Sequence, residues 1–386
     1  MKLLIYSHYF APNIGGVETI VMSLARGLAE LRTEDGSAEF AITVVTQTPR
    51  GDFNDNALLF GIVRQPRIWR LAQLIHAADV VHLAGPALPP LILALLRRKP
   101  LVIEHHGFQV ICPTGQLLIE SRGEPCPGHF MAGRRSECWR CDPSLGWFAA
   151  RKLWLLTFVR RWLCKRVAAN IMPTTWLGEQ LQLPRATTIH HGLTPIQPAQ
   201  DVAADRPGTP VIVFQGRLVS TKGAGILLEA TKILAAEGSE FRVVIIGDGP
   251  ERAKLEAATA QPPLAGRVQF AGRLAAADLE RVLQRATMVV VPSLGGEVFG
   301  LVVAENMLRG LPVIASDLGA FVEVMGEGGA HFKTGDAAEL AACLAKLIGD
   351  SRALRQLAAT GMTRAKRLCE IQSMILAHVQ EYRRID

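Results

Sequence analysis

The sequence predicts an α/β protein built from two parallel-sheet domains. Short apolar runs, such as KLLIY at 2–6 and VIVFQG at 211–216, alternate with helical patterns along almost the whole chain. This alternation is typical of parallel sheets with crossover helices. A stretch rich in Pro, Asp and Ala at 194–210 interrupts the apolar pattern and indicates a domain boundary. We therefore expect two Rossmann-like domains.

The expected elements of the first half begin with a strand and an amphipathic helix. Apolar residues of this helix recur at intervals of three and four, so one face belongs to a core. They are Val17, Ile20, Val21, Leu24, Leu28 and Leu31. The expected strands are KLLIY (2–6), ITVVT (42–46), VVHLAG (80–85), LVIEHH (101–106), ANIMPT (169–174) and TTIHH (187–191).

The second half repeats this plan. Its expected strands are VIVFQG (211–216), RVVIIG (242–247), VQFAG (268–272), MVVVPS (288–293) and PVIAS (312–316). Helical patterns such as 224–238 and 336–350 separate them. This alternation predicts a second parallel sheet with crossover helices.

Composition narrows the class of protein. The 386 residues carry a net charge of +7, which favours phosphorylated substrates, nucleic acid or an anionic membrane surface as partners. The opening MKLLIYSHYF lacks the pattern of a signal peptide, and the apolar stretch ALPPLILALL is too short to span a bilayer. We expect a cytoplasmic protein. Its seven cysteines favour reduced thiols or a metal over a disulfide framework.

Three loops that follow expected strands carry unusual residues. PNIGGVE presents Gly15 and Gly16 before a helix, which suits either backbone approach to a ligand or a tight turn. RLVSTKG presents Arg217 and Lys222, either as a diphosphate clamp or as solvated cations. GGEVFGLVVAENMLRG places Glu297 and the apolar-flanked Glu305 across a turn, where an ionised carboxylate needs a polar partner.

Four motifs in order resemble the family 4 retaining glycosyltransferases of the GT-B fold. They are GRLVSTKG (216–223), VIIGDGPER (244–252), VQFAGRL (268–274) and the FGLVVAE stretch followed by GLPVIASDLG. IGGVE, EHHG and IHHGL extend the resemblance into the first half. It implies two Rossmann-like domains facing across a cleft. These are an acceptor domain at 1–195, a donor domain at 206–368, and a last helix at 369–386 that packs back on the acceptor domain.

The resemblance also implies roles for individual residues. Glu305 would hold the ribose hydroxyls of a nucleotide-sugar donor, and Glu297 would lie beside the transferred sugar. Arg217 and Lys222 would neutralise the leaving diphosphate, and His106 would lie near the donor sugar unless it is a core histidine. The backbone at Gly15, Gly16, Gly216, Phe299, Gly300 and Leu301 would also contact the donor. No DxD motif is evident, so we expect no cofactor in catalysis and assign no nucleophile.

An insertion at 108–141 contains four cysteines: Cys112, Cys126, Cys138 and Cys141. The Cys-x-x-Cys pair at 138 and 141 has the spacing of a metal knuckle, and the other two thiols would complete tetrahedral zinc. The upstream pair is not a knuckle, so buried or loosely clustered thiols remain the alternative. A subset of the family resembles this chain in CPTGQLL with downstream cysteines.

The segment that follows, at 147–170, combines six cations with aromatic residues at helical spacing and has no acid. The cations are Arg151, Lys152, Arg160, Arg161, Lys165 and Arg166, and the aromatic residues are Trp147, Trp154, Phe158 and Trp162. This composition is typical of a helix in an anionic lipid interface, although a helix packed on the sheet with a basic edge has it too. No aromatic platform for nucleic acid is evident.

These observations predict a glycosyltransferase that moves a sugar from a nucleotide-sugar donor to a saccharide or lipid-linked acceptor in cell-envelope or exopolysaccharide synthesis. It would work in the cytoplasm, free or peripheral at the inner face of the membrane. An epimerase of the same fold and a non-catalytic sugar-nucleotide-binding protein are the alternatives. The sequence names neither the base, the sugar nor the acceptor.

Overall fold

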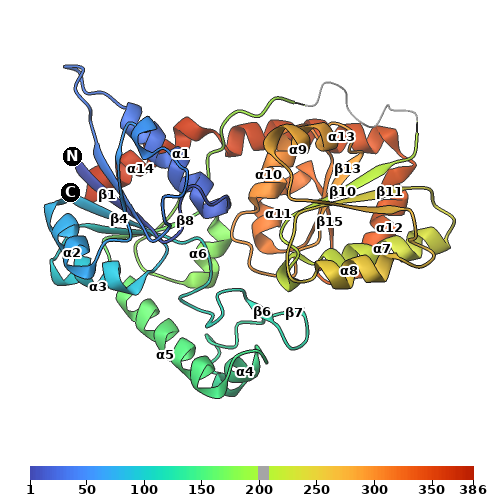
Figure 1. The fold of residues 1–386 in the computed structure, drawn as a ribbon, viewed down its shortest axis with the longest axis horizontal. Helices are drawn as coiled ribbons and strands as arrows, with labels where there is room; N and C mark the ends of the chain where they lie inside the picture. Colours follow the sequence, from blue (N-terminus) through green and yellow to red (C-terminus); the bar gives the residue numbers. More distant parts are fainter. Residues whose placement is uncertain (199–207) are drawn as a thin grey trace. The chain divides into compact units, whose positions relative to one another are not determined.

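The computed structural model describes residues 1–198 and 208–386, which divide into two compact units (Figure 1). The first unit comprises Met1–Gly115, Gly128–Thr194 and Leu368–Asp386, and the second comprises Gln116–Pro127 and Pro195–Arg367. Each unit contains its own parallel sheet, which confirms the predicted pair of Rossmann-like folds. The middle of the expected boundary at 194–210 lies outside the described residues.

The sheet of the first unit has the order β3-β2-β1-β4-β5-β8-β9. Its central strand β1 (Lys2–Ser7) pairs in parallel with both β2 (Ala41–Thr46) and β4 (Val80–Ala84). The remaining strands are β3 (Gly61–Arg64), β5 (Leu101–Glu104), β8 (Ala169–Met172) and β9 (Ala186–Thr188). The helices are α1 (Gly16–Glu30), α2 (Ile68–Ala77), α3 (Leu88–Leu96), α4 (Arg135–Arg140), α5 (Trp147–Cys164), α6 (Thr175–Leu181) and α14 (Ile371–Ile385).

The sheet of the second unit has the order β12-β11-β10-β13-β14-β15. Its strands are β10 (Val211–Gln215), β11 (Arg242–Ile246), β12 (Val268–Gly272), β13 (Met288–Val291), β14 (Val313–Ser316) and β15 (Ala330–Phe332). Its helices are α7 (Ala224–Ala236), α8 (Arg252–Thr259), α9 (Ala276–Leu283), α10 (Leu301–Leu308), α11 (Gly319–Met325), α12 (Ala337–Ile348) and α13 (Ser351–Leu368). The core packs α7 and α12 against the sheet through side chains such as Phe214, Leu227 and Leu344.

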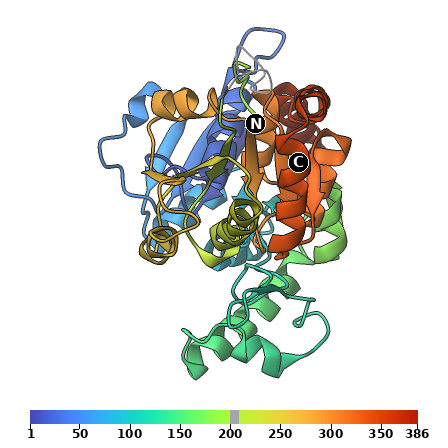
Figure 2. The same ribbon diagram turned by 90° about the vertical axis from the view of Figure 1, so that its right-hand side faces the viewer.

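Part of the expected insertion groups with the second unit, which the sequence did not predict. Its segment Gln116–Pro127 contains a small antiparallel hairpin of β6 (Leu118–Ile119) and β7 (Glu124–Pro125). The rest of the insertion, including α4, belongs to the first unit. There α4 lies beside the start of α5, and α5 continues to the sheet past α3 (Figures 1 and 2).

The helix expected at 147–170 is shorter in the structure. It ends at Cys164, and residues 169–172 form strand β8 instead. The basic residues Lys165 and Arg166 therefore lie in the turn after the helix. No helix in the described part of the chain has the length and apolar composition that a membrane crossing requires.

Helix α14 returns to the first unit from the far end of the chain and packs on α1. Its buried face carries Met374, Ile375, His378, Val379 and Tyr382. The fit is close at Gly27 of α1, where an added Cβ would lie 2.0 Å from Cδ1 of Ile375. The last helix is thus an integral layer of the first unit.

Candidate functional site

The strand order of the second unit locates its candidate binding site. The chain leaves the central strand β10 toward β11 and later returns on the other side at β13, so the connections reverse between β10 and β13. Ligands of open parallel sheets bind beyond the carboxyl ends of the strands at such a switch point. The loops after β10 and β13 are the ones that contain GRLVSTKG and GGEVFGL.

Lys222 and Glu297 form an ion pair that links these two loops. Nζ of Lys222 lies 2.6 Å from Oε1 of Glu297, and Oγ of Ser293 donates to the same oxygen at 2.8 Å. Both charged side chains are partly buried. From the sequence we expect the lysine and the glutamate to contact a ligand separately, and no motif indicates Ser293. In the structure they hold each other in place.

Close backbone approach fixes the same loops. Gly223 has φ +66°, and a Cβ there would lie 1.9 Å from the carbonyl oxygen of Pro292. A Cβ on Gly247 would lie 1.8 Å from the carbonyl oxygen of Gly216. Gly216 itself has room for a Cβ at ordinary contact distance from Phe214. The backbone of Gly216 is therefore the contact on which the loop after β11 packs. Gly223 and Gly247 are the positions that sterically require glycine.

Glu305 occupies a different environment on α10. Burial raises the pKa of its carboxyl, an effect that Arg309 opposes and Glu280 reinforces. Arg309 is engaged elsewhere, because its guanidinium binds Glu280 in a fork with contacts of 2.6 and 3.0 Å. The described residues provide no hydrogen-bond partner for the Glu305 carboxylate. Glu305 is thus a largely buried acid near the switch point that lacks the hydrogen-bond partner which buried polar groups normally have.

The turn before α10 explains how this helix begins. Gly300 adopts φ +91°, and a Cβ there would lie 2.6 Å from the ring of Phe321. Phe299 is buried, and Leu301 is the first residue of the helix. Glycine at 300 is required by both its backbone conformation and its neighbour. Helix α10 thus begins four residues after Glu297, and its first turn follows the loop at the carboxyl end of β13.

Arg217 and the hairpin complete the set of side chains around the loop after β10. The side chain of Arg217 is exposed. Ser220 Oγ donates to Oε2 of Glu120 at 2.8 Å, and a Cβ on Gly295 would lie 2.8 Å from the carbonyl oxygen of Gln116. The hairpin residues Gln116 and Glu120 therefore contact both loops of the candidate site. Sequence reasoning missed them because the motifs alone do not place an insertion on a distant loop.

The remaining predicted site residues lie in the first unit. Gly15 caps α1 with extended φ of −169°, and Gly16 is the first residue of that helix, which follows β1. His106 lies two residues beyond β5, with Nε2 3.6 Å from Oε2 of Glu104. Its ring stacks on His191 with centroids 5.3 Å apart. The structure thus divides the predicted site between the units, with Gly15, Gly16 and His106 in the first.

His105, the neighbour of His106, has a structural environment. Its Nε2 lies 2.9 Å from Oδ1 of Asn170, whose amide nitrogen donates to two backbone carbonyls. Burial lowers the pKa of His105 to about 4, so the ring is neutral at physiological pH. His105 thus stabilises the packing of β5 on β8, whereas His106 belongs to a separate cluster of histidines around Glu104.

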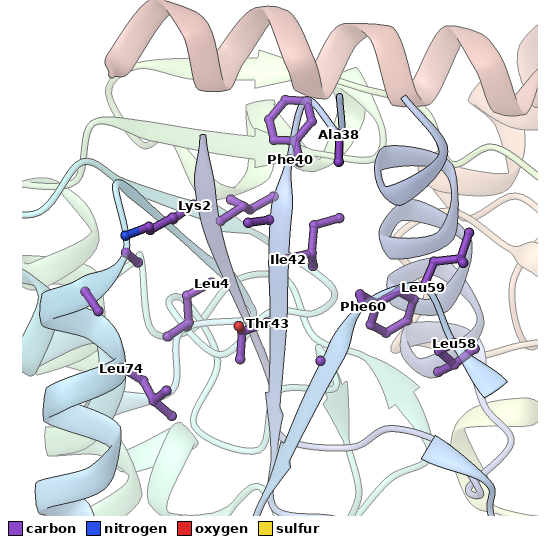
Figure 3. Close-up of a pocket in the computed structure, with 15 residues that line it drawn as sticks. Lys2, Leu4, Ala38, Phe40, Ile42, Thr43, Leu58, Leu59, Phe60 and Leu74 are labelled. Carbon is purple, nitrogen blue, oxygen red and sulfur yellow. The ribbon is translucent and has the colours of Figure 1, made fainter. Parts of the chain in front are cut away.

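An apolar hollow of about 620 Å³ in the first unit lies away from these residues (Figure 3). It is lined by Leu4, Ile42, Phe60 and Leu74, among others. Lys2, Ala41 and Gly61 also line it, and these are the first residues of β1, β2 and β3. The hollow therefore lies at the amino ends of the strands, opposite the end at which parallel sheets bind ligands.

The four cysteines of the insertion all lie among the described residues. The groups of three or more ligand side chains in the described residues contain histidines and Glu104 and no cysteine. Cys112, Cys138 and Cys141 are buried, and none of the seven cysteines, all of which are described, is in a disulfide. Zinc binding by these thiols stays a prediction.

The basic aromatic helix α5 exposes an apolar stripe. Phe148, Leu155, Phe158 and Trp162 follow one another at helical spacing and are each about half exposed or more, up to 81% for Phe148. Arg166 lies over the ring of Trp162. Arg161 instead hydrogen-bonds to the carbonyl oxygen of Leu181, and burial lowers the pKa of Arg160 and of Arg161.

Comparison with known proteins agrees with this geometry. Residues 14–195 match the model of Glycosyltransferase Family 4, and residues 209–350 match that of Glycosyl transferases group 1. The chain is 34% identical over 145 residues to a 2-deoxystreptamine glucosyltransferase of Streptomyces kanamyceticus, which covers 37% of each protein. It is 33% identical over 199 residues to a phosphatidyl-myo-inositol mannosyltransferase of Mycolicibacterium smegmatis, covering 48% of this chain and 49% of that one. These alignments thus span at most about half of either relative.

The fold is shared over nearly the whole chain. The structure of Anabaena Alr3699/HepE in complex with UDP and glucose superposes with a TM-score of 0.72 at 18% identity, covering 98% of both chains. Two parallel sheets, the glycine-bracketed loops at the switch point and the two matching family models agree with one another. The chain has the GT-B fold, and its two parts match two glycosyltransferase family models.

Proposed function

We propose that this protein transfers a sugar from a nucleotide-sugar donor, bound by the second unit, to a saccharide or lipid-linked acceptor in cell-envelope or exopolysaccharide synthesis. The observation that carries the proposal is the pair of carboxylates at the switch point. Glu297 is bound to Lys222, and Glu305 lacks a hydrogen-bond partner among the described residues. The two family models favour a transferase over an epimerase.

Each carboxylate suits a different part of the donor. A half-buried carboxylate without a partner is a strong acceptor for two adjacent hydroxyls, such as those of a ribose, because such bonds are charge-assisted. Lys222 is held by Glu297 in the ligand-free protein and would turn to a diphosphate, with the exposed Arg217 beside it in sequence. Glu297 is then released to the hydroxyls of the transferred sugar.

Catalysis in this proposal is electrostatic. Lys222 and Arg217 stabilise the charge that develops on the leaving diphosphate, which is the largest contribution that fixed charges make to such a transfer. We propose that no metal takes part and that the acceptor attacks from the face that the diphosphate leaves, with retention of anomeric configuration. His106 is the candidate for a polar contact to the donor sugar.

The donor proposal is tested by nucleotide binding measured by calorimetry. UDP, GDP and ADP identify the base, and the matching nucleoside then separates the two parts of the site. Glu305→Gln should weaken both nucleoside and diphosphate about 10-fold to 100-fold, corresponding to about 1.5–3 kcal/mol for a charged hydrogen bond. Lys222→Met should weaken only the diphosphate.

The matched control is Lys232→Met, which removes a partly exposed lysine of α7 that pairs with Glu229. It should leave both affinities unchanged. If Lys222→Met and Lys232→Met behave alike, the diphosphate assignment is wrong. Transfer from the identified nucleotide sugar to an added acceptor then separates an enzyme from a non-catalytic binding protein, which would bind the donor and release no diphosphate.

We further propose that α5 holds the first unit on an anionic membrane surface, where a lipid-linked acceptor is met. The exposed stripe of Phe148, Leu155, Phe158 and Trp162 supports this, since an interfacial helix buries such a face among the lipid headgroups. Lys152, Lys165 and Arg166 are exposed and available to anionic lipid. Arg160 and Arg161, counted in the sequence as lipid contacts, are half-buried, and Arg161 serves the packing of α5 on α6.

Vesicle flotation tests the membrane proposal with two variants of the full chain. Replacing Lys152, Lys165 and Arg166 with Gln should reduce binding to phosphatidylglycerol vesicles at low salt, since each surface cation contributes about 1 kcal/mol. Phe148→Ser with Phe158→Ser should reduce it at high salt as well. Replacing the remote surface residues Arg281, Lys254 and Arg285 with Gln is the control for net charge. Wild-type protein that stays unbound at low salt would contradict the proposal.

A further inference from the structure

A fully buried carboxylate in the first unit is surrounded by histidines from four separate segments. Glu104 is the last residue of β5, His82 lies in the middle of β4, and His378 lies on α14. His106 and His191 approach the same carboxylate from the segments that follow β5 and β9. The side chains of Glu104, His82 and His378 are all 0% exposed. Water therefore does not solvate the charge of Glu104.

Three imidazole nitrogens lie within ion-pairing distance of Glu104. Its Oε2 lies 3.3 Å from Nε2 of His82, 3.7 Å from Nε2 of His378 and 3.6 Å from Nε2 of His106. In the described part of the chain neither carboxylate oxygen has a partner in hydrogen-bonding geometry, and the same holds for Nε2 of His82 and of His378. Buried polar atoms in such numbers require an explanation.

The hydrogen bond of Nδ1 of His378 indicates which ring nitrogen of this histidine bears the hydrogen. Nδ1 lies 2.9 Å from the carbonyl oxygen of Met374, and a carbonyl only accepts, so Nδ1 bears the hydrogen. In the neutral ring, Nε2 then presents a lone pair toward Oε2 of Glu104. A lone pair facing a carboxylate oxygen is repulsive unless a positive charge lies between them. Either a proton on Nε2 or a metal ion at the centre of the cluster supplies such a charge.

The geometry matches that of a metal site. Two ligands at about 2.0–2.1 Å from a tetrahedral zinc ion lie about 3.3–3.4 Å apart, close to the separations found here. The ligand atoms of His82, Glu104 and His378 all lie within 4.8 Å of one another. Each imidazole is also held from behind, His378 by Met374 and His82 by the hydroxyl of Tyr382 at 2.8 Å. Such contacts orient the histidine ligands of metal sites.

We propose that the first unit binds one divalent transition-metal ion through Nε2 of His82, the carboxylate of Glu104 and Nε2 of His378. Two imidazoles and a carboxylate form a ligand set that suits zinc and also accommodates iron(II). The site is enclosed, so its role is structural, and it joins α14 to β4 and β5. It lies in the acceptor unit and is separate from the cysteines of the insertion and from the donor chemistry proposed for the second unit.

Metal analysis of the full-length chain tests this inference. Protein stripped with a chelator is dialysed against Zn²⁺, Fe²⁺ or Co²⁺, and the bound metal is counted by mass spectrometry. We expect one equivalent bound by wild type and the loss of that equivalent in His378→Gln and in Glu104→Gln. His76→Gln, which changes an exposed histidine of α2, is the matched control and should retain it.

Two further measurements distinguish loss of the metal site from misfolding of the variants and from metal binding by the cysteine thiols. The double variant Cys138→Ser, Cys141→Ser should still bind the ion, and its cobalt spectrum should show ligand-field bands without thiolate charge transfer. Zn²⁺ should raise the midpoint of thermal unfolding of this variant, and His378→Gln should remove that shift. Metal-free wild type after all three dialyses, or binding that vanishes with the cysteines and survives His378→Gln, would overturn the proposal in favour of a protonated cluster.

Discussion

Two carboxylates of the candidate donor site differ in how their charge is balanced. Glu297 accepts from Lys222 and Ser293, whereas Glu305 lies half-buried on α10 and its pKa is raised by burial. A largely buried carboxylate without a hydrogen-bond partner lowers the stability of the protein to which no ligand is bound. That cost is removed when hydroxyl groups of a ligand donate to it. Instability concentrated at one residue is thus a sign of function.

Glu305→Gln should therefore stabilise the ligand-free protein while it weakens nucleotide binding. Because burial raises the pKa of Glu305, its carboxyl is neutral in both states below the usual value of about 4.3, and the folding free energy lost to its ionisation grows as the pH rises from that value to the raised pKa. This cost is therefore larger at pH 7 than at pH 4. Urea unfolding should show a gain of about 0.5–2 kcal/mol at pH 7 that shrinks toward pH 4.

The control is Glu229→Gln on the exposed face of α7, which should change the free energy of unfolding little at either pH. A Glu305→Gln protein less stable than wild type at pH 7 would show that the carboxylate has a stabilising partner after all.

The sequence indicated candidate site residues one by one, but it did not indicate which of them pair. Glu297, Glu305, Lys222 and Arg217 stand in motifs whose residue types indicate their chemistry. The contact between Lys222 and Glu297 joins positions 75 apart in sequence, and only the adjacency of β10 and β13 brings them together. Likewise, nothing local distinguishes His105 from His106, because the partner of His105 is Asn170 on a neighbouring strand.

At the scale of elements, the loops of the second unit are positioned by how closely their backbones approach. The loop after β10 touches the loop after β13 at Gly223 and the loop after β11 at Gly216. Neither Gly223 nor Gly247, which faces the carbonyl of Gly216, has space for a side chain, since the opposing atoms are backbone carbonyl oxygens that cannot rotate away. These strand ends therefore act as one rigid platform for the candidate site.

Gly223→Ala should destabilise the protein by more than about 1 kcal/mol, because the alanine Cβ would meet the Pro292 carbonyl and φ is +66°. Gly225→Ala, two residues on, is the matched control. It lies inside α7, and nothing stands within 4 Å of the added Cβ. It should be neutral or stabilise by about 0.4–1 kcal/mol. Chemical denaturation of both variants measures the contrast, and equal effects would refute the steric argument.

Elements that are apolar throughout were predictable, and those at the edges were not. The buried runs of β1, β4, β10 and β13 read directly as parallel strands. The edge strands β3 and β15 were missed because GIVR and AHF are short and largely half-exposed, so they show no apolar run. The hairpin Gln116–Pro127 was missed for another reason, since its place depends on contacts with the second unit.

At the scale of the whole molecule, the chain forms two units with separate cores. The first recruits α14 from the far end of the chain, where Ile375 is 1% exposed against Gly27 of α1. The second has a core in which Leu344 of α12 is completely buried. Because each core is complete within its own unit, we expect the units to unfold in separate cooperative steps.

Two matched cavity variants test this expectation by differential scanning calorimetry. Ile375→Ala and Leu344→Ala each remove a large buried aliphatic side chain and should each cost about 2–5 kcal/mol. Ile375→Ala should lower the midpoint of one transition only, although its segment, Leu368–Asp386, directly follows the second unit in sequence. Leu344→Ala should lower only the other midpoint. The nucleotide identified by calorimetry should raise the transition that Leu344→Ala lowers, because the donor loops belong to that unit. A single transition that both variants shift equally would mean that the two cores fold as one, and the donor unit would then depend on α14 for its stability.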